Sequence, residues 1–364
     1  MKKSVCIWTA AAILAAVLLY PTKVSAVSAR KAILMDGYTG RVLYEKLADD
    51  KSLIASTTKI MTALVVCKRC CVLDTVRIPR EAVGVEGSSM YLQEGEVLAV
   101  QELLYGLMLS SGNDAAIALA IHCSGSVEAF VEEMNLQAQT LGLQGTHFAN
   151  PHGLDDPRHY STARDLAVLA SYAMQDPIFA QTVSTKTVRV GDRSLTNHNK
   201  LLWQLEGAEG VKTGFTKAAG RVLVSSAIRN GRRLVCVTID DGNDWLDHRN
   251  LHETGFSAFH PCLLVKKGQK IGSLAVFGGI EDAVDLIAGE DFQFSLAEGE
   301  SVSFAPSNKE FVYAPVVQNA EAGDAYVCID GRPVGKVSLV FDKTVEMTPQ
   351  KKETIWDKLF GGRL

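Results

Sequence analysis

The chain has 364 residues, of which 47% are hydrophobic and 21% charged, a composition typical of a globular protein with one large core and a smaller one. Its formal net charge of −4, without a basic stripe, argues against nucleic-acid binding. Eight cysteines in a chain of this length do not make a disulfide framework. We therefore expect two ordinary globular domains.

Residues 1–26 have the layout of a secretory signal peptide. Lys2 and Lys3 precede an apolar stretch over residues 5–20, and Ala26 ends an A-x-A-like cleavage site. Cleavage would remove three lysines and bring the formal net charge to −7. The alternative is an uncleaved membrane anchor, but the apolar stretch is short for a membrane-spanning helix. We expect an exported protein.

Strands open the remaining chain, and helices follow. Two apolar runs within residues 31–46 flank the turn-rich sequence DGYTG and predict a β-hairpin. Apolar residues then recur with a helical period over residues 56–66, directly after a serine suited to a helix N-terminus. The same signals predict helices over residues 101–109, 114–122, 127–141 and 162–174.

Strand character returns over residues 182–190, 221–228 and 233–240, where β-branched residues and alternation dominate. The sequence RNGR between the last two segments predicts a hairpin turn. Strands, then helices, then strands indicate an α+β domain whose first and last strands share one sheet. We place this domain at residues 27–260.

Residues 261–347 differ from this pattern. Short alternating segments such as FQFSL, SVSFA and KVSLVF are separated by Gly, Pro and acidic turns. We expect a separate all-β domain, which serves as a spacer or binding module because it contains no plausible catalytic cluster.

The tail, residues 348–364, has an amphipathic pattern. If residues 352–360 are helical, one face carries the apolar side chains of Ile355, Trp356, Leu359 and Phe360. This pattern predicts a helix in the membrane interface, with reversible attachment because the apolar residues are few. The alternative is a tail that packs on the β-rich domain or frays.

The sequence CKRCC at residues 67–71 raises the question of a zinc site. No histidine with finger-like spacing follows it, and Cys67 continues the apolar face that begins at Ile60. Packing is therefore the favoured role of these cysteines. We expect neither a metal nor a cofactor.

Three short motifs carry the chemistry, and the first is STTK at residues 56–59. Ser56 and Lys59 are three residues apart and therefore lie on one face of a helix, where the lysine amine can reach the serine hydroxyl. A serine hydroxyl needs a base to become a nucleophile, and a lysine is a base only when burial or a nearby positive charge lowers its pKa. No acid stands beside Lys59 in the sequence IASTTKIMTAL. Alone, however, this motif also fits a capped helix with a solvated lysine.

The second and third motifs are SGN at residues 111–113 and KTG at residues 212–214. Taken singly, the former fits a helix cap and the latter a turn before a strand. All three motifs in this order, separated by domain-scale distances, indicate a shared catalytic site.

With these motifs the chain resembles the serine-type D-Ala-D-Ala carboxypeptidases, the low-molecular-mass penicillin-binding proteins. The resemblance extends over about residues 30–256, in blocks such as MDGYTGRVLYEKLAD, LLYGLMLSSGNDAAIALA, THFANPHGLDDPRHYSTARDLAVLA and GVKTGFTKAAG. The β-rich remainder resembles the C-terminal domain of many members. The implied fold is an α+β penicillin-binding-protein/β-lactamase-like transpeptidase domain followed by a smaller all-β domain.

The resemblance also implies roles for individual residues. Ser56 would be the acyl-forming nucleophile, Lys59 its base and Ser111 a proton relay, with the oxyanion bound by the backbone N–H groups of Ser56 and Phe215. His152 lies in a loop beside the family's active site, as a catalytic residue or as an ordinary loop histidine. The implied substrate-binding residues are Asn113, Lys212, Thr213, Gly214, Phe215 and Thr216.

Two positions depart from the family pattern. Many relatives have an arginine for the substrate carboxylate where this chain has Asp244, and a proline is common at Ile54. Arg249 or Arg221 could replace the arginine, or carboxylate binding could rest on Lys212 and the two threonines after it.

The expected function is removal of the terminal D-alanine from peptidoglycan stem peptides, with β-lactams as acylating inhibitors and the outer face of the cytoplasmic membrane as the location. A β-lactamase-like hydrolase is one alternative, although no E-x-x-L-N block lies between SGN and KTG. A catalytically silent wall-binding protein is another, and the intact motifs argue against it.

Overall fold

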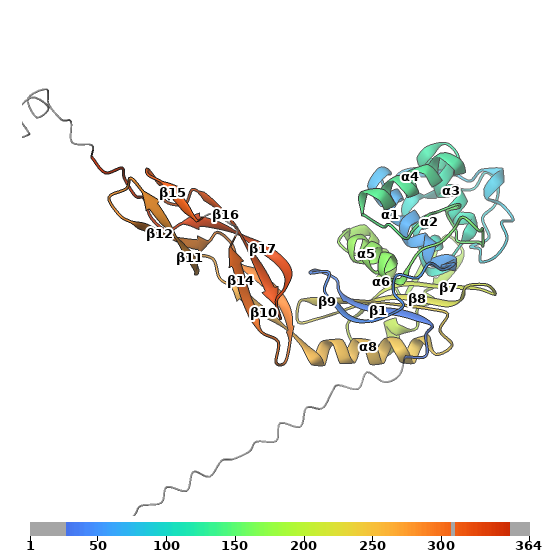
Figure 1. Ribbon diagram of the computed structural model, residues 1–364. Coiled ribbons are helices and arrows are strands. Elements are labelled where there is room, and N and C mark those ends of the chain that lie inside the picture. Colours follow the sequence, from blue (N-terminus) through green and yellow to red (C-terminus); the bar gives the residue numbers. More distant parts are fainter. Residues whose placement is uncertain (1–26, 307–309, 350–364) are drawn as a thin grey trace, which may run out of the picture.

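A five-stranded antiparallel sheet forms the centre of the first domain (Figure 1). Its strand order is β2-β1-β9-β8-β7, so the first and last strands of the domain share one sheet, as predicted. The strands are β1 (Lys31–Asp36), β2 (Val42–Lys46), β7 (Ala208–Thr216), β8 (Gly220–Arg229) and β9 (Arg232–Ile239). This computed structural model describes residues 27–306 and 310–349, so the predicted signal peptide and residues 350–364 of the tail lie outside the described residues.

Both predicted hairpins are present. β1 and β2 pair in the first, and β8 and β9 pair in the second. Asn230 and Gly231 form the β8–β9 turn with φ values of 49° and 76°, which places both residues in the left-handed region. That conformation is the one a two-residue hairpin turn of this type requires, and the Asn-Gly sequence supplies it with little strain.

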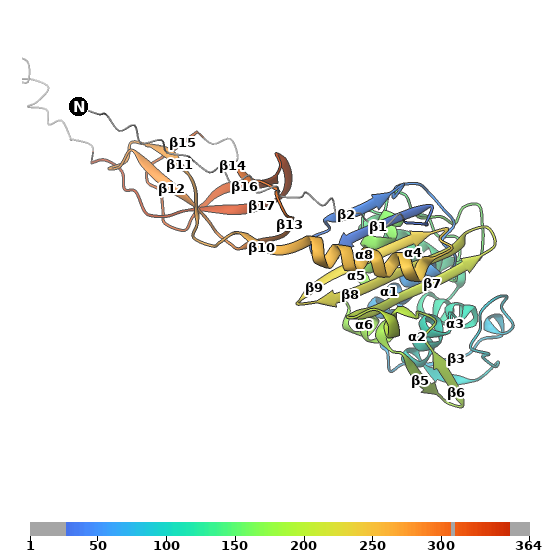
Figure 2. The same ribbon diagram turned by 90° about the horizontal axis from the view of Figure 1, so that it is seen from below.

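Helices cover both faces of the sheet. Six lie on one face: α1 (Lys59–Arg69), α2 (Val100–Leu109), α3 (Asn113–Ser124), α4 (Val127–Thr140), α5 (Ala163–Ala173) and α6 (Pro177–Ser184). The other face is covered by α8 (Asp244–Ala258) (Figure 2). The short elements are η1 (Ala55–Thr58), η2 (Arg80–Ala82), α7 (Leu201–Gln204), β3 (Thr75–Arg77), β4 (Val97–Ala99), β5 (Thr187–Val190) and β6 (Arg193–Thr196). The main hydrophobic core lies between the six helices and the sheet.

The predicted strand over residues 182–190 is wrong over residues 182–184, which belong to α6, and the observed strand β5 begins at Thr187. Asp176 caps this helix, because its carboxylate accepts hydrogen bonds from the backbone N–H groups of Ile178 and Phe179 at 2.8 and 3.0 Å. Pro177 occupies the first helical position, which it favours. The cap signal outweighs the β-branched residues Thr182 and Val183, whose side chains are buried.

In the described part of the chain, no single helix has the length and apolarity to cross a membrane. Only α3 and α4 taken together, which meet at 85°, satisfy the length and composition test.

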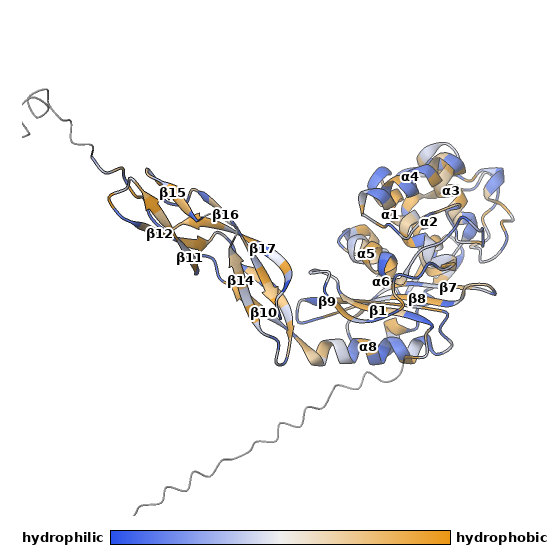
Figure 3. Ribbon diagram, in the orientation of Figure 1, coloured by the Kyte–Doolittle hydropathy of each residue, from blue (hydrophilic) through white to orange (hydrophobic). Residues whose placement is uncertain are grey.

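The second domain is all-β and extends away from the first (Figure 2). A six-stranded sheet with the order β14-β16-β17-β12-β11-β15 is accompanied by the pair β10–β13. The strands are β10 (Phe259–Val265), β11 (Lys270–Phe277), β12 (Ala283–Ala288), β13 (Phe292–Ala297), β14 (Val302–Pro306), β15 (Phe311–Tyr313), β16 (Glu321–Ile329) and β17 (Arg332–Phe341). Alternating apolar residues along these strands form a separate core (Figure 3).

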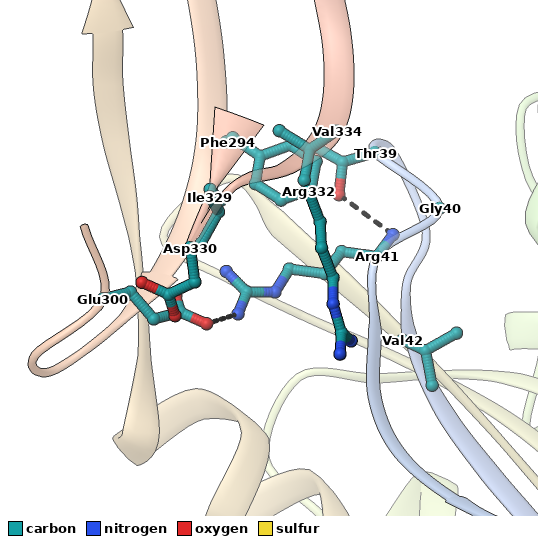
Figure 4. Close-up of a pocket in the computed structure, with 10 residues that line it drawn as sticks. All are labelled: Thr39, Gly40, Arg41, Val42, Phe294, Glu300, Ile329, Asp330, Arg332 and Val334. Carbon is teal, nitrogen blue, oxygen red and sulfur yellow. Dashed lines mark hydrogen bonds and ion pairs between the residues drawn. The ribbon is translucent and has the colours of Figure 1, made fainter. Parts of the chain in front are cut away.

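Charged side chains join the two domains. Arg41, in the β1–β2 turn, donates to the carbonyl oxygen of Ser295 and pairs with Glu300 beside a cavity between the domains (Figure 4). Asp36 accepts from Arg232 at 3.1 Å and from the hydroxyl of Ser295 at 2.8 Å. These contacts tie the β domain to the central sheet.

Candidate active site

Ser56 lies in a short 3-10 turn rather than in the first turn of a continuous α-helix. This turn, η1, ends at Thr58, and α1 begins at Lys59. Ala55 precedes the serine with a φ of 46°, an unfavourable conformation for a residue with a side chain. The turn leaves Ser56 partly exposed while it buries Lys59 completely.

The amine of Lys59 contacts three oxygens. Its Nζ lies 3.0 Å from Ser56 Oγ, 2.6 Å from Asn113 Oδ1 and 2.7 Å from the carbonyl oxygen of His152. Desolvation lowers the pKa of Lys59 well below its ordinary value, and repulsion from Lys212 lowers it further. Both effects shift the equilibrium of this side chain toward the neutral amine.

This geometry orients the neutral amine. A neutral amine has two N–H bonds and one lone pair, whereas the amide oxygen of Asn113 and the carbonyl of His152 can only accept. When the two N–H bonds point at those acceptors, the lone pair faces Ser56 Oγ. Lys59 is thus placed to remove the proton of the Ser56 hydroxyl.

The SGN motif lies in the turn between α2 and α3. Ser111 has a φ of 61° and lines the same cavity as Ser56, and Asn113 begins α3. The Asn113 amide donates to the carbonyl oxygen of Glu86 at 2.5 Å, which fixes its own oxygen toward Lys59. Asp114, which the sequence analysis did not single out, accepts from Ser89 at 2.6 Å and from backbone N–H groups of the neighbouring loop.

The KTG motif lies on β7, the edge strand beside η1. A Cβ at Gly214 would lie 3.0 Å from the backbone nitrogen of Ser56, a tight contact, so glycine suits this close approach of the two backbones. Lys212 is buried behind the cavity, and desolvation lowers its pKa to about 7. The strand therefore brings backbone groups and a positive charge to Ser56.

The cavity beside Ser56 contains predicted and unpredicted residues. Its predicted residues are Ser56, Ser111, Thr213, Gly214, Phe215, Arg221 and Asp244. Sequence reasoning missed Ser88, His198, Lys200, Val222 and Trp245, which also line it. They come from separate loops and strands, and no motif links them. Only Trp245 had an available signal, because it directly follows Asp244, the position at which many relatives have an arginine.

Arg221 and Asp244 form a bidentate ion pair in the cavity wall. Arg221 Nε lies 3.0 Å from Asp244 Oδ2, and Nη2 lies 2.9 and 2.8 Å from the two carboxylate oxygens. The side chain of Asp244 is 4% exposed and that of Arg221 is 44% exposed. Asp244 thus holds a guanidinium at the cavity, whereas Arg249 does not line it.

The predicted substrate-binding residues Asn113 and Lys212 are buried and do not line the cavity, and Thr216 and His152 also lie differently from expectation. Thr216 does not line the cavity, since its hydroxyl donates to Asp155 at 2.9 Å. His152 supplies its carbonyl oxygen to Lys59, and burial with repulsion from Lys59 lowers the pKa of its ring to about 3. The adjacent Gly153 is required, because a Cβ there would lie 1.9 Å from the carbonyl oxygen of Ala55.

One group of side chains in the described residues has the spacing of metal ligands. Ligand atoms of Cys236, His248 and His252 lie within 4.8 Å of one another, under α8 on the other face of the sheet. Both rings are hydrogen-bonded to the Ser225 hydroxyl, at 2.7 and 2.8 Å. This group is therefore a hydrogen-bonded network within the packed interior.

A serine hydroxyl in contact with a buried lysine amine, in a cavity with basic side chains in its wall, is the arrangement of a serine hydrolase. Comparison with known protein families identifies which serine hydrolases it resembles. Residues 20–243 match the D-alanyl-D-alanine carboxypeptidase family, and residues 259–347 match the penicillin-binding protein 5 C-terminal domain. The chain belongs to the D-alanyl-D-alanine carboxypeptidase family and is a serine-type D-Ala-D-Ala carboxypeptidase.

Similar proteins span most of both domains. D-alanyl-D-alanine carboxypeptidase DacF of Bacillus subtilis is 32% identical over 83% of this chain and 82% of its own. DacC of Escherichia coli is 33% identical over 88% and 85%. Penicillin binding protein 5 from Haemophilus influenzae has a TM-score of 0.76 and 31% identity, covering 88% of this chain and 98% of that one. The predicted fold class and family are thus confirmed.

Proposed function

We propose that the chain is an exported enzyme that removes the terminal D-alanine of peptidoglycan stem peptides through an acyl-enzyme at Ser56, and that penicillins acylate the same serine. The observation that carries this proposal is the contact of Ser56 Oγ with a buried lysine amine, at 3.0 Å. The cationic cavity around it suits a substrate that ends in a carboxylate.

The reaction has two steps. Lys59 takes the proton of the Ser56 hydroxyl while Oγ attacks the carbonyl carbon of the penultimate D-alanine. The negative charge on the carbonyl oxygen is stabilised by the backbone N–H groups of Ser56 and Phe215. The C–N bond breaks, and the leaving amine of the terminal D-alanine receives its proton through Ser111. Water then hydrolyses the ester, with Lys59 as base.

Arg221 compensates for the arginine that many relatives have at the position of Asp244. Arg221 offers its remaining N–H groups to the cavity because Asp244 holds the guanidinium by its Nε edge. We assign the substrate carboxylate to Arg221, the Thr213 hydroxyl and the positive charge of Lys212. Thr216 has no part in this binding, since its hydroxyl is turned to Asp155.

The cavity favours a carboxypeptidase over a β-lactamase. Of the cavity-lining residues in the described part of the chain, Asp244 alone is acidic, and it is paired with Arg221. No carboxylate is therefore placed to drive water rapidly onto a penicilloyl ester.

Two reagents test the function. The protein is incubated with a labelled penicillin and with a diacylated Lys-D-Ala-D-Ala peptide, and adduct and free D-alanine are measured. We expect a stable adduct at Ser56 and released D-alanine, both lost in Ser56→Ala. Labelling of the variant at the wild-type rate would refute the nucleophile, and rapid release of penicilloic acid would support the β-lactamase alternative.

The sequence supports attachment to the outer face of the cytoplasmic membrane. Residues 1–26 have the pattern of an export signal, and the tail has the pattern of an interfacial helix. A chain truncated after Thr348 is expected to stay active on soluble peptide while it loses most of its binding to anionic vesicles. Equal sedimentation of both forms would exclude the tail as an anchor.

A further inference from the structure

Strand β15 lies at the end of the β domain away from the catalytic domain (Figure 1), and three aromatic side chains gather on it and on its neighbour β11. Phe277 ends β11, and Phe311 and Tyr313 lie on the neighbouring edge strand β15. The ring centroids are 5.2 to 6.2 Å apart, and the three residues are 55%, 45% and 72% exposed. A cluster of exposed aromatic rings is unusual on a soluble surface and indicates an interaction site.

Strand register places these rings outward. β11 and β15 are parallel, with Phe277 opposite Tyr313 and Val276 opposite Val312. Side chains alternate along each strand, so the two valines face the second core and the aromatic rings face outward. The core positions of both strands are therefore filled, and the rings are not displaced core residues.

The chain leaves the described structure beside these rings. The backbone nitrogen of Thr348 donates to the Gly278 carbonyl at 2.8 Å, and that of Ile280 donates to the Glu346 carbonyl at 2.9 Å. Ile280 and Met347 are 58% and 55% exposed and extend the apolar surface. Residues 350–364, whose pattern predicts an interfacial helix, therefore begin at the edge of this surface.

We propose that this aromatic patch, made by Phe277, Ile280, Phe311, Tyr313 and Met347, lies in the interfacial layer of a phospholipid bilayer. Aromatic rings concentrate at the headgroup level of membranes. The tail alone has few apolar residues, and stable attachment generally takes two signals. A tail held at the bilayer brings the patch to the same layer, because Thr348 is hydrogen-bonded next to Phe277.

Vesicle binding of the full mature chain tests the proposal. The triple variant Phe277→Ser, Phe311→Ser, Tyr313→Ser is compared with wild type on phosphatidylglycerol–phosphatidylcholine vesicles, and we expect a partition coefficient at least about tenfold lower. The matched control changes Leu73, Val97 and Leu136 to Ser, which are 76%, 51% and 58% exposed in the catalytic domain. The control keeps wild-type partitioning, and thermal unfolding with peptide hydrolysis shows that both variants are folded.

A second measurement locates the patch directly. In a Trp356→Phe background, Tyr313→Trp adds a fluorophore in the patch and Leu73→Trp adds one far from it, and the emission of Trp203 and Trp245, measured in the background alone, is subtracted. Brominated lipids are expected to quench the first and not the second. If the triple variant partitioned onto vesicles as wild type does, the tail alone would account for binding. If brominated lipids quenched both added tryptophans equally, the patch would not lie in the bilayer. Vesicle-independent dimerisation that the triple variant abolishes would make the patch an interface between copies. Each of these three results overturns the proposal, and none affects the test of Ser56.

Discussion

In the proposed mechanism, acylation depends most directly on Lys59, whose amine lies 3.0 Å from Ser56 Oγ. Replacement by arginine keeps a positive charge but removes the base, since a guanidinium is not deprotonated in proteins. We expect Lys59→Arg to lower kcat/KM by about 10²- to 10⁴-fold, as Lys59→Ala does. The measurement is D-alanine release and penicillin labelling of both variants, and substantial activity in the arginine variant would contradict the assignment.

Arg221 is expected to act on binding more than on turnover. Arg221→Gln removes the cation that Asp244 holds in the cavity, so KM for the peptide should rise about tenfold while kcat changes little. A peptide with a C-terminal carboxamide provides the control, because it lacks the anion. Wild type should prefer the free acid and the variant should not, and an unchanged preference would show that Arg221 does not bind the carboxylate.

The pH dependence of kcat/KM should reflect the loss of the proton from Lys212. Burial lowers its pKa to about 7, so the charge that we assign to binding of the substrate carboxylate is lost as pH rises through that value. We expect kcat/KM to fall on the alkaline side, mainly through KM, and Lys212→Arg to shift that fall to higher pH.

Thermal unfolding distinguishes this loss from denaturation. The unfolded chain keeps the Lys212 proton up to the ordinary pKa of 10.5, so the unfolding free energy contributed by this group rises between pH 7 and 10.5. An alkaline fall in activity accompanied by lower stability would contradict this explanation.

At the scale of elements, α6 depends on a local cap. Asp176→Ala removes the carboxylate that accepts from Ile178 and Phe179, which should cost about 1 kcal/mol and lower Tm by about 2 to 4 °C. Asp176→Asn is the matched control, because asparagine also caps helices. Equal Tm values for the two variants would show that the cap contributes nothing measurable.

Much of the fold could be predicted because it follows local periodicity and turn chemistry. The β8–β9 hairpin depends on Asn-Gly, and α2 to α5 depend on apolar spacing and caps. α6 was missed because its β-branched residues resemble a strand, although Asp176-Pro177 was a cap signal. The 3-10 turn at Ser56 could not be predicted, since Gly214 and Gly153 fix it from distant parts of the chain.

The candidate site could likewise be predicted in part only. Three motifs predicted Ser56, Lys59, Ser111 and Thr213 at one site, and the structure brings them together. The pairing of Arg221 with Asp244 depends on β8 packing beside the start of α8, 23 residues later in the chain, and no local pattern predicts it.

At the scale of the whole molecule, Arg41 joins the two domains. Arg41→Ala removes its contacts with Ser295 and Glu300 and should widen the range of domain orientations, which small-angle X-ray scattering measures as a broader distance distribution. Hydrolysis of soluble peptide should be unchanged, because the cavity beside Ser56 contains no residue of the β domain. Arg80→Ala, at an exposed ion pair within the catalytic domain, is the control. An identical distribution for the two variants would show that Arg41 does not fix the domains.

The contacts of Arg41 and Asp36 with Ser295 would also determine where a membrane-bound enzyme can work. The β domain separates the Ser56 cavity from the aromatic patch, and both ends are carried by one connected body (Figure 2). On a bilayer, such a body would hold the cavity at a constant height above the lipid. Only stem peptides in one thin layer of the wall would then reach the cavity. The length of the β domain would thus select substrates by their distance from the membrane, without chemical recognition of the glycan.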